Sequence, residues 1–222
     1  FSKKHFHPWS SQNVFFCTSS KYTEITHISF EDEEGNRNGI FSKEGAVLDW
    51  HRDHHEFWVH LLSCVDPGIS GNTHYVNMQQ MYNYFKGENI HDLDCKLVSE
   101  SKINQLCNDM DNLEKKHMHS STYTTKTVSL VQTHPLTHEK IIVYDPSFHA
   151  AFCRNNKAIP VQEEQYLRSQ FNDYLNNISN QFIHSWKKGD VIIADQMLTI
   201  HSRDAVYGNR FINRMYGHYK EE

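Results

Sequence analysis

The sequence lacks the features that mark several broad classes of protein. Its five cysteines are scattered and form no CxxC pair, so neither a zinc knuckle nor a disulfide framework is indicated. No apolar run approaches the roughly 20 residues needed to span a bilayer, and no signal peptide is recognisable. At a formal net charge of -5, no dense basic run offers a surface for nucleic acid. We therefore expect a cytoplasmic protein with reduced thiols, and neither nucleic acid nor a membrane as its partner.

Internal repeats, low-complexity tracts and a linker between domains are also missing. A chain of 222 residues is long enough to bury one sizeable core, so we expect a single domain over residues 1–222. The first residue is Phe1 rather than Met, and we expect that an N-terminal segment is missing. Nothing in the sequence decides whether the chain forms a homo-oligomer.

Short stretches rich in β-branched and aromatic residues predict strands near both ends of the chain. The expected strands are 13–18, 25–30, a short run at 46–48, 57–65 with one polar intrusion at His60, 71–76, 127–132, 140–144, a buried strand ending at 195, and 211–219. Apolar residues recur every three or four positions over 78–85, 99–113 and 162–183, which predicts helices there. Strands at both ends with helices as insertions favour a mainly β fold with α insertions and a double-stranded β-helix core, jelly-roll or cupin-like.

Histidine is the residue type in excess, with seventeen in the chain, most of which must be structural or lie on the surface. One stretch combines histidines with carboxylates directly after an apolar run. Residues i and i+2 of a strand point to the same face, so His51 and Asp53 can bind one metal ion while Arg52 faces away. From this motif alone a second interpretation stays open, in which the histidine only hydrogen-bonds a neighbouring carboxylate. The nearby pair His54 and Glu56 is a further competitor.

The pair needs a third ligand, and the best candidate is His201, which follows another apolar stretch. Two imidazoles and one carboxylate on one side of a metal leave the opposite side open, as in non-haem Fe(II) oxygenases. A jelly roll brings distant strands together, so His51, Asp53 and His201 are the predicted catalytic metal ligands. Taken alone, His201 is equally consistent with an ordinary core or rim histidine.

Two arginines, Arg210 and Arg214, follow the second histidine. The planar guanidinium of arginine matches a carboxylate with two parallel hydrogen bonds. An arginine in this place could anchor the distal carboxylate of a dicarboxylate cosubstrate. A surface arginine on an edge strand is the alternative.

These pieces occur in one order, and that order resembles the taurine dioxygenase family, the TauD/TfdA-like Fe(II)/2-oxoglutarate dioxygenases, over almost the whole chain. The family patterns are FGxLHxHP, WHTD, GGxT, THPxTGxK, WxxGDxxxxDNxxxxHxxxA and RxxxR. They correspond in turn to residues 1–8, 50–53, 71–73, 133–140, 186–205 and 210–214. This sequence departs from them at Asn72, at His138 in place of the hairpin glycine, and at Gln196 in place of the asparagine after the buried strand.

The resemblance implies a cofactor, two cosubstrates and the residues that hold them. His51, Asp53 and His201 would carry Fe(II), with 2-oxoglutarate and O2 as cosubstrates. Thr73 and Arg210 would hold the distal carboxylate of 2-oxoglutarate.

The resemblance also implies the reaction, which is hydroxylation of a C–H bond of a small organic molecule with succinate and CO2 as coproducts. Arg214 matches an arginine near the primary substrate or the iron-bound end of the cosubstrate, so an anionic substrate is expected. His7 and His54 match positions that face the substrate. Two alternatives remain: a catalytically inactive binding protein that keeps the metal fold, and a cupin-type metal hydrolase or isomerase that works without 2-oxoglutarate.

Overall fold

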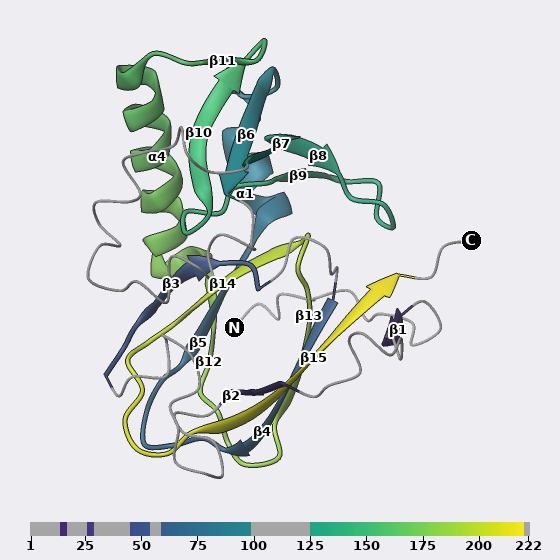
Figure 1. The fold of residues 1–222 in the computed structure, drawn as a ribbon, viewed down its shortest axis with the longest axis vertical. Coiled ribbons are helices and arrows are strands. Elements are labelled where there is room, and N and C mark those ends of the chain that lie inside the picture. Colours follow the sequence, from purple (N-terminus) through teal and green to yellow (C-terminus); the bar gives the residue numbers. More distant parts are fainter. Residues whose placement is uncertain (1–13, 17–25, 29–44, 54–58, 99–124, 220–222) are drawn as a thin grey trace.

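The computed structural model describes residues 14–16, 26–28, 45–53, 59–98 and 125–219 (Figure 1). The helix expected over 99–113 lies outside these residues. So do the predicted substrate residues His7 and His54 and the competing ligand Glu56. Within the described residues, two layers are apparent: a barrel of strands and, above it in Figure 1, a layer of strands and helices.

The larger sheet of the barrel has the order β1–β15–β4–β13, and β2 also pairs with β15. Its strands are β1 (Val14–Phe16), β15 (Phe211–Tyr219), β4 (Val59–Asp66), β13 (Val191–Asp195) and β2 (Thr26–Ile28). All of these pairings are antiparallel. Strands of this sheet come from both ends of the sequence, as a jelly-roll topology requires.

The smaller sheet has the order β12–β5–β14–β3. Its strands are β12 (Gln181–His184), β5 (Thr73–Asn77), β14 (Thr199–Arg203) and β3 (Leu48–His51). Its inner face meets the larger sheet, because the ring of His60 on β4 lies 5.0 Å from that of His201 and 6.1 Å from that of Tyr75. Two sheets facing each other in this way form the double-stranded β-helix core that the sequence predicted.

The upper layer contains the main apolar core. Its elements are β6 (Leu93–Val98), β7 (Thr125–Ser129), β8 (Val131–Thr133), β9 (Lys140–Ile142), β10 (His149–Arg154), β11 (Lys157–Ala158), α1 (Met78–Phe85) and α4 (Val161–Asn176). One face of α1 buries Met78, Met81 and Phe85, and α4 buries Leu167, Phe171 and Leu175 against the same cluster. This core supports the end of the barrel at which β3 and β14 meet.

The long helix expected over 162–183 is shorter in the structure. α4 ends at Asn176, because Asn177 turns extended and its side chain caps the next segment by accepting from the Ser179 amide at 3.0 Å. A short 3-10 turn, η4 (Ile178–Asn180), follows, and then β12 pairs with β5. The apolar residues of this stretch repeat with helical spacing, but pairing with a neighbouring strand decides its conformation.

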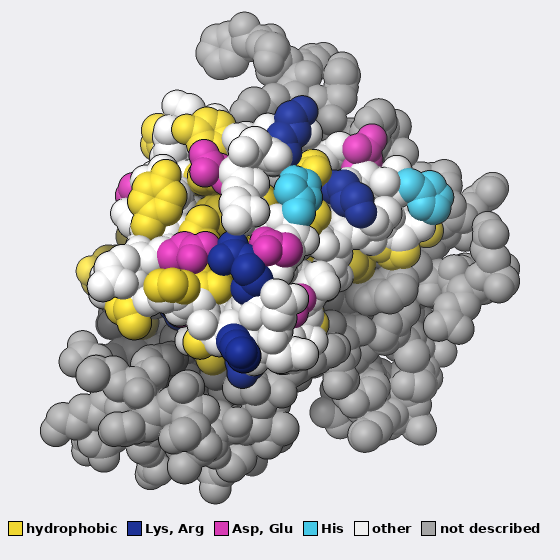
Figure 2. Space-filling view, turned by 90° about the horizontal axis from the view of Figure 1, so that it is seen from above, with side chains coloured by type: hydrophobic (Ala, Val, Ile, Leu, Met, Phe, Trp, Pro, Cys, Tyr) yellow, Lys and Arg dark blue, Asp and Glu magenta, His cyan; other side chains and the backbone are white. Residues whose placement is uncertain are grey.

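The surface of the upper layer, seen from above in Figure 2, carries lysine, arginine, aspartate and glutamate side chains interspersed over its described part. Among the described residues of this layer, Arg154 forms ion pairs with both Asp92 and Glu163. None of the helices in the described part of the chain is long and apolar enough to cross a membrane.

Candidate metal centre

Two neighbouring strands bring the predicted metal ligands together. His201 on β14 and His51 at the end of β3 are direct partners in the antiparallel pairing, with ring centroids 4.3 Å apart. The Oδ1 atom of Asp53 lies 3.5 Å from His51 Nε2 and 3.8 Å from His201 Nε2. The three ligand atoms therefore lie within 4.8 Å of one another.

The backbone between the predicted ligands differs in one respect from the expected strand. β3 ends at His51, and Asp53 lies in the bend that follows. Arg52 is buried rather than merely turned away, and its guanidinium donates to the carbonyl of Ile142 at 3.3 Å. A strand that continued to Asp53 would direct Arg52 to the opposite face of the sheet; the bend instead sends it into the protein.

Hydrogen bonds from three segments hold the ligands in place. His51 Nδ1 donates to a backbone carbonyl two residues earlier, at 2.7 Å, which leaves Nε2 to face the centre. The amide of Arg52 donates to Asp145 Oδ2 at 2.9 Å, and the amide of Asp53 donates to Gln196 Oε1 at 3.0 Å. Gln196 therefore helps to fix the backbone at Asp53, although it departs from the family pattern.

The charges of the centre favour an ionised carboxylate beside a neutral imidazole. Burial by itself would raise the pKa of Asp53, but Arg214, with Nη1 at 2.8 Å from Oδ1, and the neighbouring histidines hold that pKa well below its usual range. Burial and the adjacent His51 lower the pKa of His201. Burial also lowers the pKa of His51, but its hydrogen bond and charge interaction with Asp53 outweigh this and raise it. Metal ligands must be deprotonated, so metal binding would compete with protonation of His51.

A third histidine, His60 on β4, reaches this centre from the other sheet. It is fully buried, and its Nδ1 lies 3.1 Å from Asp53 Oδ2. Sequence reasoning assigned it no function, although it interrupts the apolar run that predicted this strand. That interruption was the available signal.

The predicted cosubstrate residues Thr73 and Arg210 form a second buried cluster. Arg210 donates from Nη2 to Thr73 Oγ1 at 3.4 Å and from Nη1 to the carbonyl of Gly71 at 2.8 Å. Trp186 Nε1 donates to the same Thr73 hydroxyl at 2.8 Å, and the Arg210 guanidinium lies 5.7 Å from the Trp186 ring centroid. Burial, with the nearby Arg203, lowers the pKa of Arg210 to about 10.

Gly71 lets this cluster form. Its φ of +102° lies where side chains are rarely tolerated, and a Cβ there would lie 2.3 Å from Val206 Cγ2 and 2.9 Å from Arg210 Nη1. The first glycine of the predicted turn is therefore needed both for backbone conformation and for the approach of the arginine. Thr73 lies two residues before Tyr75, which is paired with His201, so the two clusters share the inner face of β5.

Two other motif residues serve the scaffold. His134 of the hairpin donates from Nε2 to Asp195 Oδ2 at 2.8 Å, and Asp195 Oδ1 accepts from the amides of Met197 and Leu198. His138, in place of the hairpin glycine, has φ 58°, so this histidine adopts the left-handed conformation for which glycine is preferred.

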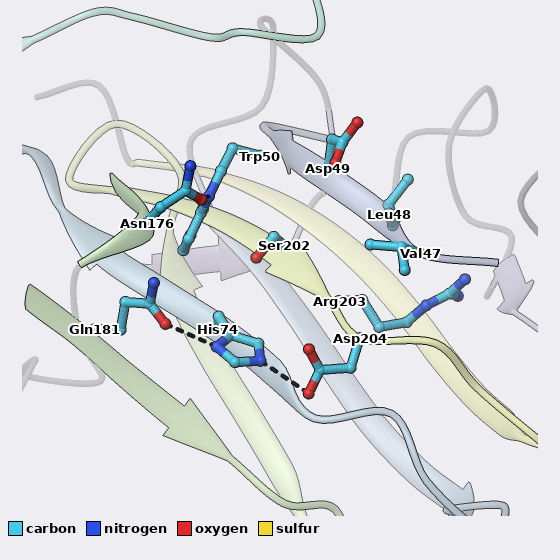
Figure 3. Close-up of a pocket in the computed structure, with 10 residues that line it drawn as sticks. All are labelled: Val47, Leu48, Asp49, Trp50, His74, Asn176, Gln181, Ser202, Arg203 and Asp204. Carbon is cyan, nitrogen blue, oxygen red and sulfur yellow. Dashed lines mark hydrogen bonds and ion pairs between the residues drawn. The ribbon is translucent and has the colours of Figure 1, made fainter. Parts of the chain in front are cut away.

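A cavity of about 220 Å³ lies on the outer face of the smaller sheet (Figure 3). Trp50, His74 and Ser202 line it, and each is next in sequence to a residue of the inner face, so strand alternation separates it from the metal centre. His74 is bracketed there by Gln181 at 2.9 Å and Asp204 at 3.0 Å. The cavity is distinct from the predicted site.

The predicted residues thus fall into three groups. His51, Asp53 and His201 converge, and Arg214 contacts this triad. Thr73 and Arg210 form the neighbouring buried cluster. His7 and His54 lie outside the described residues and stay predictions.

Similar folds occur among solved structures. AAD-2, determined in complex with Mn(II) and N-oxalylglycine, is 20% identical with a TM-score of 0.67, over 90% of this chain and 74% of that chain. A putative alpha-ketoglutarate-dependent taurine dioxygenase from Burkholderia xenovorans is 16% identical with a TM-score of 0.63, over 94% and 70%. A taurine dioxygenase from Burkholderia xenovorans is 16% identical with a TM-score of 0.62, over 94% and 68%. At these identities the likeness shows the fold.

Sequence comparison gives the family. A search of curated proteins finds no match. The sequence model of the taurine catabolism dioxygenase TauD, TfdA family matches residues 10–216, which is most of the chain. The chain therefore belongs to this family of dioxygenases, as its motifs predicted, and it is an enzyme that uses Fe(II), 2-oxoglutarate and O2.

Proposed function

We propose that this enzyme hydroxylates a C–H bond of a small anionic organic molecule and releases succinate and CO2. The observation that carries the proposal is the convergence of His51, Asp53 and His201 on the inner face of the barrel. Their donor set is the one that non-haem Fe(II) oxygenases use. Atoms that bind one first-row ion at about 2.1 Å lie between about 3 and 4 Å apart. The separations of 3.5 and 3.8 Å from Asp53 Oδ1 to the two Nε2 atoms fit such an ion.

Bound Fe(II), together with 2-oxoglutarate and O2, supplies the oxidising chemistry, and the protein supplies binding and orientation. His51, Asp53 and His201 would hold the ion from one side. The buried rings of Tyr75 and His60 pack against His201 and keep water from that side of the centre.

Thr73 and Arg210 are the residues that we propose for the distal carboxylate of 2-oxoglutarate. Arg210 is a buried cation, and its Nε has no hydrogen-bond partner among the described residues. A buried, unsatisfied donor costs about 1–3 kcal/mol, which a bound carboxylate would recover. AAD-2 was determined with N-oxalylglycine, a dicarboxylate of similar length, and this supports a dicarboxylate site in the fold.

Arg214 is the residue from which we infer an anionic substrate. Its side chain is 22% exposed, and it already contacts Asp53. A cation in this place suits a sulfonate, carboxylate or phosphonate of the substrate, or the iron-bound end of the cosubstrate.

We propose His7 and His54 as further substrate contacts. We also propose that residues 1–222 form one domain.

The direct test is succinate formation from 2-oxoglutarate by the purified chain with Fe(II), ascorbate and O2. A panel of small sulfonates, carboxylates and phosphonates is compared with neutral and cationic analogues of the same size, and Asp53→Ala is the background control. We expect at least one anion to raise succinate formation and to yield a hydroxylated or cleaved product. Succinate no higher than that of Asp53→Ala would favour the inactive binding protein. Turnover without 2-oxoglutarate would favour the hydrolase or isomerase, and stimulation by neutral or cationic molecules alone would exclude an anionic substrate.

The cosubstrate site is tested separately by Arg210→Ala. We expect 2-oxoglutarate binding, measured by calorimetry with Mn(II) in place of Fe(II), to weaken by at least about 30-fold, because a buried charge-assisted contact is lost. Arg154→Ala removes an arginine from the surface of the upper layer and should leave the affinity unchanged. An unchanged affinity in Arg210→Ala would remove this residue from the cosubstrate site.

A further inference from the structure

We infer that His60 is a positioning residue that selects which oxygen of Asp53 faces the metal ion. The inference rests on the proposed metal centre and assigns it a residue that none of the motifs contains. His60 lies on β4 in the larger sheet, whereas Asp53 follows β3 in the smaller sheet. One buried side chain therefore ties the ligand loop to the opposite wall of the barrel.

Both ring nitrogens of His60 have partners, and these partners determine its tautomer. Nδ1 lies 3.1 Å from Asp53 Oδ2, and Nε2 lies 3.4 Å from the hydroxyl of Tyr75. An ionised carboxylate can only accept, so Nδ1 must carry the hydrogen. Nε2 is then the acceptor, and the Tyr75 hydroxyl donates to it. The chain of contacts runs from Tyr75 through His60 to Asp53.

The two carboxylate oxygens of Asp53 consequently have different surroundings. Oδ2 is held by His60, while Oδ1 faces His51 Nε2 at 3.5 Å and His201 Nε2 at 3.8 Å. Arg214 contacts Oδ1 at 2.8 Å, so the oxygen directed at the centre is also the one neutralised by a cation. A carboxylate fixed in this way offers one oxygen to an ion and leaves more positions for cosubstrates.

His60 is placed to orient a ligand rather than to act as one. Among the described residues, the group able to hold a metal consists of His51, Asp53 and His201 and does not include His60. The Nδ1 atom of His60 contacts Asp53 Oδ2, whereas the Nε2 atoms of His51 and His201 lie nearest to Oδ1. Partners of this kind typically change metal affinity by about 10–100-fold when they are removed.

The test compares two polar substitutions with different reach. The amide nitrogen of His60→Asn falls near the Nδ1 position and can still donate to Asp53, whereas that of His60→Gln falls near Nε2 and cannot. We expect Co(II) affinity, measured by calorimetry, to fall about 10–100-fold in His60→Gln and to stay within about threefold of the parent in His60→Asn. Tyr75→Phe removes only the hydroxyl beyond His60, so its Co(II) affinity should also stay within about threefold of the parent.

His74→Gln is the matched control. It makes the same substitution on the outer face of β5, where the side chain contacts Gln181 and Asp204, and it should leave Co(II) affinity unchanged. Circular dichroism and melting curves of the metal-free proteins check that each variant folds. If His60→Gln does not fold, the other two variants still test the inference. A tenfold loss of Co(II) affinity in His60→Asn, with no loss in Tyr75→Phe, would contradict it.

The possible outcomes separate this inference from the proposed function. A parent protein that binds no Co(II) overturns both. If the parent and His60→Gln bind Co(II) equally well, only the positioning role is overturned. The same conclusion follows if His60→Asn and His60→Gln weaken Co(II) binding equally. Visible Co(II) bands that lose intensity or shift in His60→Asn as they would on loss of a nitrogen ligand would make His60 a ligand, and the positioning role would be wrong.

Discussion

The buried pairs His134–Asp195 and His60–Asp53 have similar geometry and different surroundings. His134 and Asp195 are joined at 2.8 Å, and His60 and Asp53 are joined at 3.1 Å. In the first pair the remaining atoms face backbone amides, because Asp195 Oδ1 accepts from Met197 and Leu198. In the second pair the remaining oxygen of Asp53 faces two imidazoles and an arginine.

The difference separates a structural pair from a candidate catalytic one. Amides are fixed donors, so Asp195 is satisfied by the fold itself and stiffens the turn between β13 and β14. Two imidazoles and a carboxylate are ligands, and an ion can enter between them. The distance within a pair and its burial do not show whether the pair is structural or catalytic. The partners of the aspartate oxygen that does not contact the histidine do show it.

The largest expected effect follows from removing the charge of the second pair. Asp53→Asn keeps the size of the side chain but replaces an anionic ligand with a neutral amide. We expect Co(II) affinity to fall by more than about 1,000-fold, or about 4 kcal/mol. Calorimetry measures the affinity, and circular dichroism checks that the metal-free fold is kept. Binding within about tenfold of the parent would exclude Asp53 as a ligand.

The matching change in the first pair should act on stability instead. Asp195→Ala removes the acceptor of two amides and one imidazole, and at about 1 kcal/mol for each hydrogen bond the loss is about 3 kcal/mol. Urea unfolding of the metal-free protein measures it. The folded fraction should still bind Co(II) within a few-fold of the parent. A stable variant that has lost Co(II) binding would contradict the structural role of this pair.

The same contrast explains what the sequence could predict. The cluster of His51, Asp53 and His201 was predictable, because metal chemistry limits the residue types that can serve as ligands and because apolar runs precede these residues. Helix α1 and strand β15 have the predicted bounds. Both results depend on information carried within a few neighbouring residues.

What could not be predicted depends on contacts across the fold. His60 looked like a polar interruption because its partner Asp53 comes from the opposite sheet. The end of α4 at Asn176 depends on a side-chain cap and on the pairing of β12 with β5. Strands β6 and β10 were not among the predicted strands, and they pair with each other over a long separation in sequence.

A smaller effect should follow from Gln196, which joins the two pairs. It is next to Asp195 in sequence and accepts the amide of Asp53 at 3.0 Å. Gln196→Met keeps the length of the side chain but leaves that amide without its acceptor, at a cost of about 1–2 kcal/mol. We expect urea unfolding to report this loss and Co(II) affinity to fall only a few-fold. If neither the stability in urea nor the Co(II) affinity changes in this variant, Gln196 does not couple the two pairs.

The smallest expected effect comes from a third pair, in which the partner is farther away. His149 is buried, its Nε2 lies 3.7 Å from Glu164 Oε1, and burial lowers its pKa to about 4, although Glu164 opposes this and Arg168 adds to it. In the unfolded chain the pKa is near its usual value of about 6.5, so the unfolded state binds more protons at intermediate pH and stability is lost as the pH falls. Between about pH 7 and about pH 5.5 this amounts to about 1 kcal/mol. His149→Phe should remove that part of the pH dependence, measured as the difference in urea midpoints between the two proteins. Parallel curves would mean that His149 is charged in the folded protein.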